Sequence, residues 1–113
     1  MRWFLRSKIH RATITEANPD YTGSITIDQA LVKKAGLLPG EKVLVVSLTS
    51  GARLETYIIS GRKNSGEICM NGAAALLIKR KEMVIIMGFE LANRPVRQKN
   101  VLVDKNNKFV GFL

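Results

Sequence analysis

The chain has 113 residues, which is enough for one domain with a modest core and too few for two. Hydrophobic residues make up 46% of it, as in a globular protein, and the longest apolar run, residues 83–89, is far below the roughly 20 residues that cross a bilayer. The formal net charge of +9 favours anionic partners such as an acidic small molecule, nucleic acid or a membrane surface, but the basic residues are spread along the chain and predict a solvated basic surface.

The single cysteine and the single histidine limit the possible disulfides and metal sites. Cys69 is the only cysteine, so no intrachain disulfide can form and a reducing compartment is the simplest setting. His10 is the only histidine, which excludes a metal site built on several imidazoles. With one cysteine and one histidine there is no Cys/His cluster, so we expect no metal. The N-terminal residues lack the apolar stretch of a signal peptide, so we expect a cytoplasmic protein.

The first third of the chain predicts a strand, a turn, a short strand and a helix. Residues 3–15 mix β-branched and basic residues and predict a strand, which ends at the turn formers 18–20. Residues 24–27 predict a short strand. Asp28 is a suitable N-cap for a helix that ends with Gly36 in the C′ position.

The middle of the chain predicts a hairpin followed by a strand and a second helix. Residues 42–48 and 53–60 predict two strands joined by a tight turn. Residues 67–70 predict another short strand. Asn71 can then cap a short helix over residues 73–78.

The last third predicts three more strands. Residues 83–89 are apolar enough for a buried strand, and the pattern breaks at residues 93–95. A strand resumes at residues 101–103. Residues 106–107 turn the chain into a final strand near Phe109.

Many short strands, two short helices and no repeats or linkers favour a mainly-β fold in a single domain over residues 1–113. Because closure removes exposed strand edges, we expect a small closed β-barrel. The strand order does not follow from the pattern alone.

The pair Gly23-Ser24, before the strand predicted over residues 24–27, has distinctive chemistry. The Ser24 oxygen can attack the preceding carbonyl carbon and turn the amide into an ester. Gly23 has no Cβ, so it accepts strained dihedral angles and leaves the approach open. Loss of the Ser24 Cα proton would then expel the Gly23 carboxylate, and hydrolysis with release of ammonia would leave a pyruvoyl ketone. Taken alone, the pair favours a plain bend that leads into a strand.

The Gly23-Ser24 pair lies in one of four segments that are separated along the chain. They are residues 8–13 (KIHRAT), 21–28 (YTGSITID), 51–57 (GARLETY) and 71–75 (NGAAA). In order and spacing they resemble the aspartate 1-decarboxylase family of pantothenate biosynthesis. The resemblance extends from about the N-terminus to residues 84–86, and more weakly to the end.

The resemblance implies a double-psi β-barrel that assembles as a homotetramer, with active sites between subunits. It implies autocatalytic cleavage between Gly23 and Ser24, which leaves chains of residues 1–23 and 24–113. The implied reaction converts L-aspartate to β-alanine and carbon dioxide. The pyruvoyl group made from Ser24 would take up the substrate amine and serve as the electron sink, so no added cofactor and no metal are expected.

The resemblance also assigns a proton donor and a group that assists cleavage. Tyr57 would return a proton to the decarboxylated carbon, next to a cation such as Lys8 or Arg53. From position alone, Tyr57 would instead be an aromatic residue packed on the barrel. Thr56 would contact the substrate and donate to the Gly23 carbonyl, unless it is a strand threonine placed there for its β-propensity. In a regular strand the two neighbours point to opposite faces, so both can line one pocket only at a bulge or a strand end.

Arg53 and Lys8 are the predicted partners of the substrate carboxylates. Arg53 lies four residues before Tyr57, hence on the same side of an extended strand, and its planar guanidinium suits a carboxylate. For either cation the alternative is a solvated surface residue.

The small residues after Asn71 and the single histidine complete the expected substrate pocket. Asn71 stands at a predicted helix start, where free backbone N–H groups can bind an anion. The resemblance places the substrate against Gly72, Ala73 and Ala74, and it makes His10 part of the pocket. A simple capped helix and a structural histidine are the alternatives.

Two other functions stay open. A net charge of +9 suits phosphate binding, so a small basic β-barrel that binds nucleic acid is one alternative, although aromatic residues are only 6% and no recognition helix is evident. The other is an uncleaved relative that binds small anions. With the decarboxylase we expect no nucleic-acid or membrane partner. Lys81-Glu82 replaces the Gly-Asp turn expected of the family, which affects the loop before residue 83.

Overall fold

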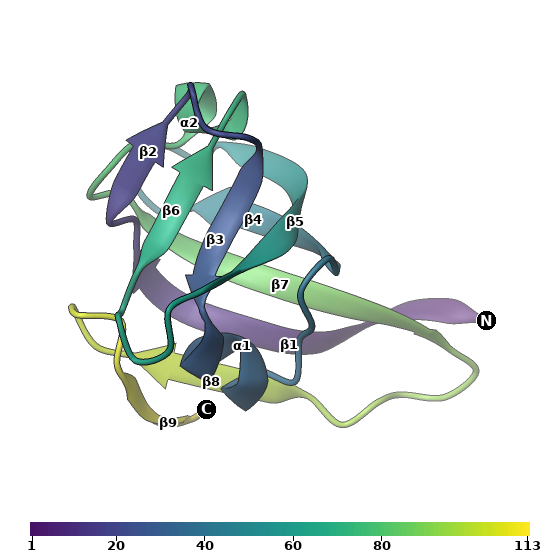
Figure 1. The fold of residues 1–113 in the computed structure, drawn as a ribbon. Helices are drawn as coiled ribbons and strands as arrows, with labels where there is room; N and C mark the ends of the chain where they lie inside the picture. Colours follow the sequence, from purple (N-terminus) through teal and green to yellow (C-terminus); the bar gives the residue numbers. More distant parts are fainter.

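Nine strands and two short helices make up the computed structural model, which describes all residues from Met1 to Leu113 (Figure 1). The strands are β1 (Arg2–Thr13), β2 (Glu16–Asn18), β3 (Ser24–Asp28), β4 (Lys42–Ser47), β5 (Arg53–Gly61), β6 (Ile68–Asn71), β7 (Met83–Ala92), β8 (Lys99–Val103) and β9 (Phe109–Phe112). The helices are α1 (Gln29–Lys34) and α2 (Ala74–Leu77), and neither has the length and apolar character that a membrane span needs. Every predicted strand and helix is present, whereas β2 was not predicted.

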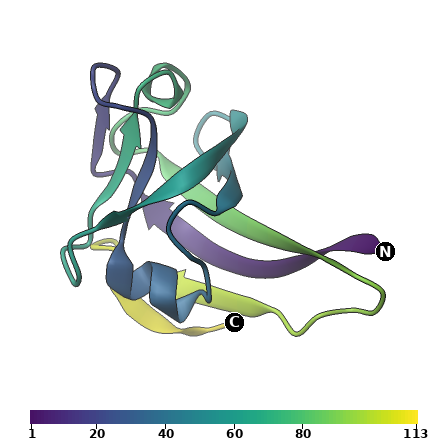
Figure 2. The ribbon, with the colours of Figure 1, turned by 45° about the vertical axis from the view of Figure 1, so that its right-hand side comes forward.

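The strands form one curved sheet in the order β2-β6-β3-β5-β4-β7-β1-β8-β9. The chain bends between β1 and β2, where the Ile14 N–H donates to the Glu82 carbonyl (2.9 Å) and the Thr15 N–H to the Ile68 carbonyl (2.8 Å). Because β2 continues β1 and pairs with β6, the chain itself brings the sheet round into a small barrel (Figures 1 and 2). The predicted mainly-β barrel is confirmed, with the correction that the sheet is not strictly closed.

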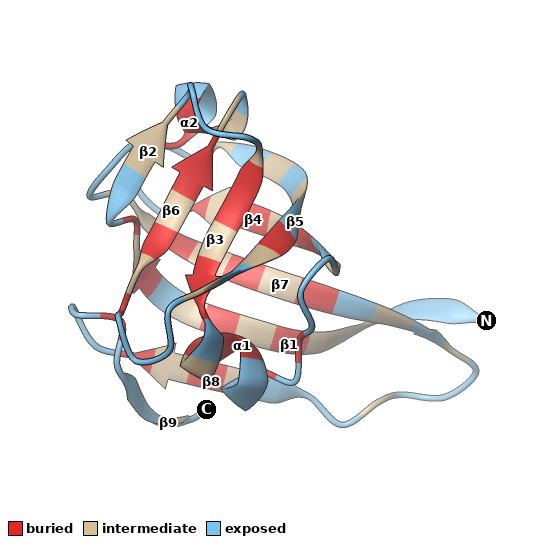
Figure 3. Cartoon of the chain, viewed as in Figure 1, coloured by how far each residue is buried: buried red, intermediate tan, exposed pale blue.

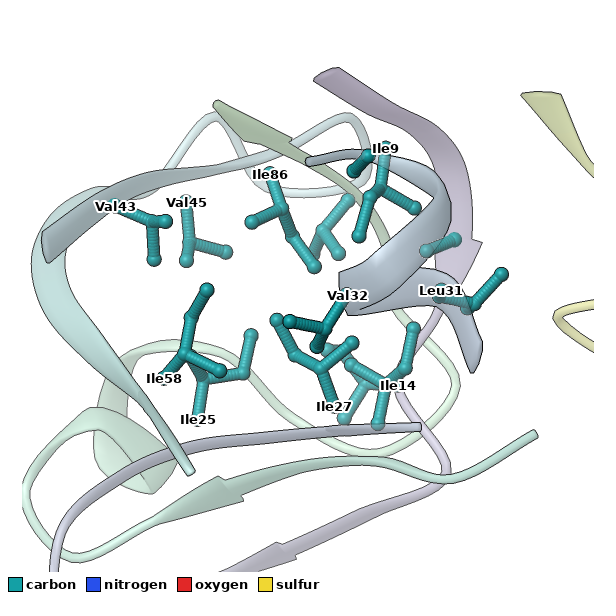
Figure 4. Packing of buried hydrophobic residues seen from close by; sticks show 14 of the residues in the cluster. Ile9, Ile14, Ile25, Ile27, Leu31, Val32, Val43, Val45, Ile58 and Ile86 are labelled. Atoms are coloured by element: carbon teal, nitrogen blue, oxygen red, sulfur yellow. The ribbon is translucent and has the colours of Figure 1, made fainter. Parts of the chain in front are cut away.

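A single cluster of 20 buried hydrophobic residues fills the barrel. Most are isoleucine and valine, whose branched side chains suit the crowded face of a strand. Figure 4 shows Ile25 and Ile58 on one side of this interior and Val45 and Ile86 on the other. Along the central strands, buried and less buried residues alternate in Figure 3, as the period of two requires.

Helix α1 begins and ends as predicted. The Ala30 N–H donates to Asp28 Oδ1 at 2.8 Å, and Gly36 follows the helix with a φ of +70°. Asp28 also accepts the N–H groups of Asn64 (2.9 Å) and Gly66 (2.8 Å), so one buried carboxylate joins α1 to the loop after β5. Helix α1 lies near β8, and α2 lies at the opposite end of the barrel (Figures 1 and 2).

Helix α2 is present, but the prediction that Asn71 caps it is wrong. Ala73 precedes the helix and makes no side-chain capping bond. Asn71 still belongs to β6, where it pairs with Ser24 of β3. There its Nδ2 donates to Thr26 Oγ1 at 2.9 Å.

Glu82 holds the loop before β7. It accepts hydrogen bonds from the Ser47 hydroxyl (2.6 Å), the Ser50 hydroxyl (3.0 Å) and the Lys79 N–H (2.7 Å). These hydrogen bonds lower the pKa of Glu82 below its ordinary value, and the bond from Ser47 has the largest effect. Lys81 adopts the left-handed conformation, with a φ of +75°, so the turn forms without the expected glycine.

Replacing Glu82 with Gln should lower the free energy of unfolding by about 1 kcal/mol near pH 7, because a neutral amide loses the charge-assisted bonds. The pKa of Glu82 is lower in the folded chain than in the unfolded chain, so its contribution is present above the unfolded pKa of about 4.3 and is lost as the pH falls through the folded pKa. Urea denaturation at about pH 7 and about pH 3 measures the difference.

Glu16→Gln is the matched control, since Glu16 is exposed. Its substitution should change stability little at either pH. A difference between Glu82→Gln and the wild type that does not shrink in acid would contradict this account.

Candidate active site

Ser24 is buried at the start of β3. It pairs with Asn71 in the antiparallel ladder between β3 and β6, and it is 4% exposed. The parallel ladder between β3 and β5 begins one residue later, at Ile25 and Ile58. The bond between Gly23 and Ser24 therefore lies at the end of two ladders, where a loop becomes a strand.

A cavity of about 310 Å³ opens beside this bond. Its lining consists of Gly23, Ser24, Leu54, Glu55, Thr56, Asn71, Ala73, Ala74 and Leu77. Two hydroxyl groups, one amide and the Glu55 carboxylate thus stand among small and apolar side chains. The volume is sufficient for a small molecule.

Thr56 and Tyr57 both approach the bond, although they point to opposite faces of β5. Thr56 lines the cavity, whereas Tyr57 lies on the outer face and is 46% exposed. A methyl group at position 23 would still lie only 3.8 Å from the Tyr57 phenol oxygen. Because β3 pairs with β5 only from Ile25 onward, Gly23 lies past the strand end, where groups from both faces of β5 can reach it.

Asn71 and the three small residues after it form one wall of the site. Ala73 and Ala74 line the cavity, and Gly72 lies directly against Gly23. The wall is the end of β6 and the turn into α2. The structure thus brings all four of these predicted residues to the bond.

Arg53 is not part of the cavity lining. It begins β5, is exposed, and lies on the same face as Tyr57, as alternation predicts. The one charged residue in the lining is Glu55, whose carboxylate pairs with Lys42 at 2.9 Å. A single chain therefore presents no cation inside the cavity, and no group of three or more His, Cys, Asp or Glu residues is placed to hold a metal ion.

Lys8 and His10 are not brought to this cavity either. Ser7 and Ile9 are buried on the inner face of β1, so Lys8 and His10 lie on its outer face. The His10 Nδ1 atom is buried and has no hydrogen-bond partner. Burial lowers the pKa of His10, and the charges of Lys8 and Arg11 lower it further, so its imidazole is neutral near pH 7.

Five residues at the site were not predicted from the sequence: Leu54, Glu55 and Leu77 in the cavity lining, and Asn18 and Thr26, which hydrogen-bond to its wall. The Asn18 carbonyl accepts the N–H groups of Gly72 (3.0 Å) and Tyr21 (3.3 Å), and Thr26 holds the side chain of the asparagine in β6. Leu54 lines the cavity, and the alternation along β5 could have identified it. Asn18 and Thr26 act through a backbone carbonyl and a cross-strand contact, for which the sequence has no local signal.

A larger cavity of about 510 Å³ lies on the outer surface, lined by Trp3, Glu41, Lys42, Val43, Leu44, Glu55 and Phe89. Its charged groups are engaged in ion pairs, Lys42 with Glu55 and Glu41 with Arg6, and none of its lining residues belongs to the predicted site. The smaller cavity is the better candidate because it contains the Ser24 hydroxyl beside a glycine carbonyl.

A family model described as aspartate decarboxylase matches residues 1–110. The chain belongs to the aspartate decarboxylase family. An aspartate 1-decarboxylase of Corynebacterium efficiens is 53% identical over 116 residues, covering 99% of this chain and 85% of the relative. That of Caldicellulosiruptor saccharolyticus is 53% identical over 110 residues (94% and 86%), and that of Neisseria meningitidis is 50% identical over 111 residues (95% and 87%). The resemblance to this family is confirmed over nearly the whole chain.

In this member of the aspartate decarboxylase family, replacing Thr26 with Val should lower the free energy of unfolding by about 1–2 kcal/mol. The reason is that Asn71 is 5% exposed and its amide would lose its partner. In an Asn71→Ala background the same change should cost much less, since no amide is left unpaired. Urea denaturation of the four variants completes the double-mutant cycle, and an equal cost in both backgrounds would show that the hydrogen bond contributes nothing.

Proposed function

We propose that this chain is a pyruvoyl-dependent decarboxylase that converts L-aspartate to β-alanine and carbon dioxide in pantothenate biosynthesis. The observation that carries the proposal is the Gly23-Ser24 bond beside a cavity lined by Thr56 and Asn71, in a member of the aspartate decarboxylase family. Three relatives named aspartate 1-decarboxylase are 50–53% identical to the chain, which supports the assignment of the reaction.

The first step is cleavage of the bond by the chain itself. Ser24 Oγ attacks the Gly23 carbonyl carbon, the hydroxyl proton passes to the Ser24 nitrogen, and the C–N bond breaks to leave an ester. We assign the Thr56 hydroxyl, on the cavity side of β5, to stabilise the oxyanion formed during attack. Loss of the Ser24 Cα proton then expels the Gly23 carboxylate, and hydrolysis of the resulting dehydroalanine releases ammonia and leaves the pyruvoyl group.

The residues around position 24 fit such a group. Ser24 is held by its pairing with Asn71 at the end of β3, and the adjacent cavity has room for a small substrate. When formed, the pyruvoyl group supplies an electrophilic ketone that takes up the substrate amine and withdraws electrons from the carbon that loses its carboxylate. Ala73 and Ala74 have small side chains, so the substrate can lie close to the backbone on this side of the cavity.

Tyr57 and Arg53 act from the outer face of β5. The phenol oxygen of Tyr57 lies close to Gly23 and donates the proton that replaces the lost carboxylate. Arg53, four residues earlier on the same face, binds a substrate carboxylate through its planar guanidinium.

A neighbouring subunit of a homotetramer completes the pocket. The cavity of one chain holds no cation for a substrate with two carboxylates, while Lys8 and His10 project from the outer face of β1. One chain also leaves large apolar side chains exposed, among them Trp3 (68%), Leu76 (63%) and Phe112 (57%). Such surface is typical of interfaces between subunits. We therefore assign Lys8 and His10 to the pocket of an adjacent subunit.

The family relationship favours catalysis over nucleic-acid binding and over anion binding without cleavage. Such an enzyme needs no nucleic acid and no membrane partner. We place it in the cytoplasm, where the small-molecule substrate L-aspartate is available.

Replacing Ser24 with Ala should abolish cleavage and decarboxylation together, because the attacking oxygen is removed. Mass spectrometry of the wild type should show fragments of residues 1–23 and 24–113, the second blocked at its N-terminus by a ketone. Ser60→Ala, at an exposed serine of β5, is the control and should cleave like the wild type. A wild-type chain that stays intact after prolonged incubation would refute the proposal.

Replacing Tyr57 with Phe should leave cleavage intact and lower kcat by at least about 10²-fold, since the variant lacks the proton donor. Release of carbon dioxide and formation of β-alanine measure turnover, and fragment masses measure cleavage. Tyr21→Phe, which alters the other tyrosine, should keep most of the activity. Wild-type turnover by Tyr57→Phe would remove Tyr57 from the reaction.

A further inference from the structure

Gly72, which follows β6, packs backbone against backbone on Gly23. A Cβ at position 72 would lie 3.1 Å from the Gly23 Cα, 3.3 Å from the Gly23 nitrogen and 3.3 Å from the Tyr21 carbonyl oxygen. All three are main-chain atoms, so no flexible side chain could swing aside to make room. Gly72 also has a φ of +65°, in the left-handed region that favours glycine.

Hydrogen bonds hold the residues on both sides of this contact. The Asn18 carbonyl accepts the N–H of Gly72 at 3.0 Å and that of Tyr21 at 3.3 Å. Ser24, the residue after Gly23, is held by its pairing with the residue before Gly72 in the ladder between β3 and β6. Gly23 is therefore confined between the Gly72 backbone and an anchored Ser24.

We propose that Gly72 is a positioning residue for self-cleavage: its contact sets the torsion angles of Gly23 at which Ser24 Oγ reaches the Gly23 carbonyl carbon. This inference rests on the proposed self-cleavage, and it gives Gly72 a role before any substrate binds. A side chain at position 72 would push Gly23 by a few tenths of an ångström, while the ladder keeps Ser24 in place. The displacement would therefore change the geometry of the Gly23-Ser24 bond. Attack within a chain depends steeply on geometry, and a misplacement of about 1 Å can cost about 10²-fold in rate.

The chain contains matched controls for the strain of the left-handed backbone. Gly51 has a φ of +78° and Gly40 a φ of +83°, and a Cβ at either position would meet no atom within 4 Å. Alanine at these positions introduces the backbone strain alone. Alanine at position 72 introduces similar strain together with the collision with Gly23, so the comparison isolates the contact.

The test follows newly synthesised full-length chains by mass spectrometry over time, for the wild type, Gly72→Ala, Gly51→Ala and Gly40→Ala. We expect Gly72→Ala to form the fragments 1–23 and 24–113 at least about 10-fold more slowly than the wild type, and both controls to stay within about 2-fold. Thermal unfolding of each variant in a Ser24→Ala background, which keeps the chain intact, shows whether the fold has formed.

Gly72→Asn is a second variant, because asparagine tolerates positive φ better than alanine and carries the same Cβ. It should fold and also cleave slowly. Wild-type cleavage by either folded variant would overturn the inference and leave the proposed function standing. Unfolding of both variants while both controls fold would also overturn it, because Gly72 would then be required for the fold itself. A wild type that never cleaves would instead refute the proposed function, and this inference with it.

Discussion

The pairing of Ser24 with Asn71 is the constraint on which the candidate site depends. It joins two segments that are far apart in the chain, and it brings the wall of small residues against the Gly23-Ser24 bond. The next residue, Ile25, is fully buried in the core and pairs with β5, so the start of β3 is anchored on both sides. The proposed nucleophile, Ser24, is thus held next to a glycine that can accept strain, and the proposed intramolecular attack requires such an arrangement.

The distribution of charge explains why a basic chain can have a nearly neutral cavity. The net charge is +9, yet the one ionised residue in the cavity lining is Glu55, and Lys42 neutralises it. The cations of the predicted site lie on outer faces, Arg53 on β5 and Lys8 on β1. They are therefore placed to attract an acidic small molecule from solution, and the overall charge does not by itself indicate nucleic acid.

Most of the fold could be predicted because its signals are local. The period of two along the strands, and the cap and glycine around α1, act within a few residues and are visible in the sequence. The Gly23-Ser24 pair and the four motifs likewise identified the family before any contact was known. Only β2 was missed, since its three residues form a strand through pairing with β6 and not through a pattern of their own.

The sequence by itself determined the family, the bond expected to break and every element except β2. Only the tertiary structure decided which groups meet at that bond: Asn71 turns to Thr26 instead of capping α2, Gly72 touches Gly23, and His10 faces away from the cavity. The physical reason is that these contacts depend on the register between strands distant in sequence. A shift of one residue in that register would turn each side chain to the other face of the sheet, and no local pattern of residues specifies it.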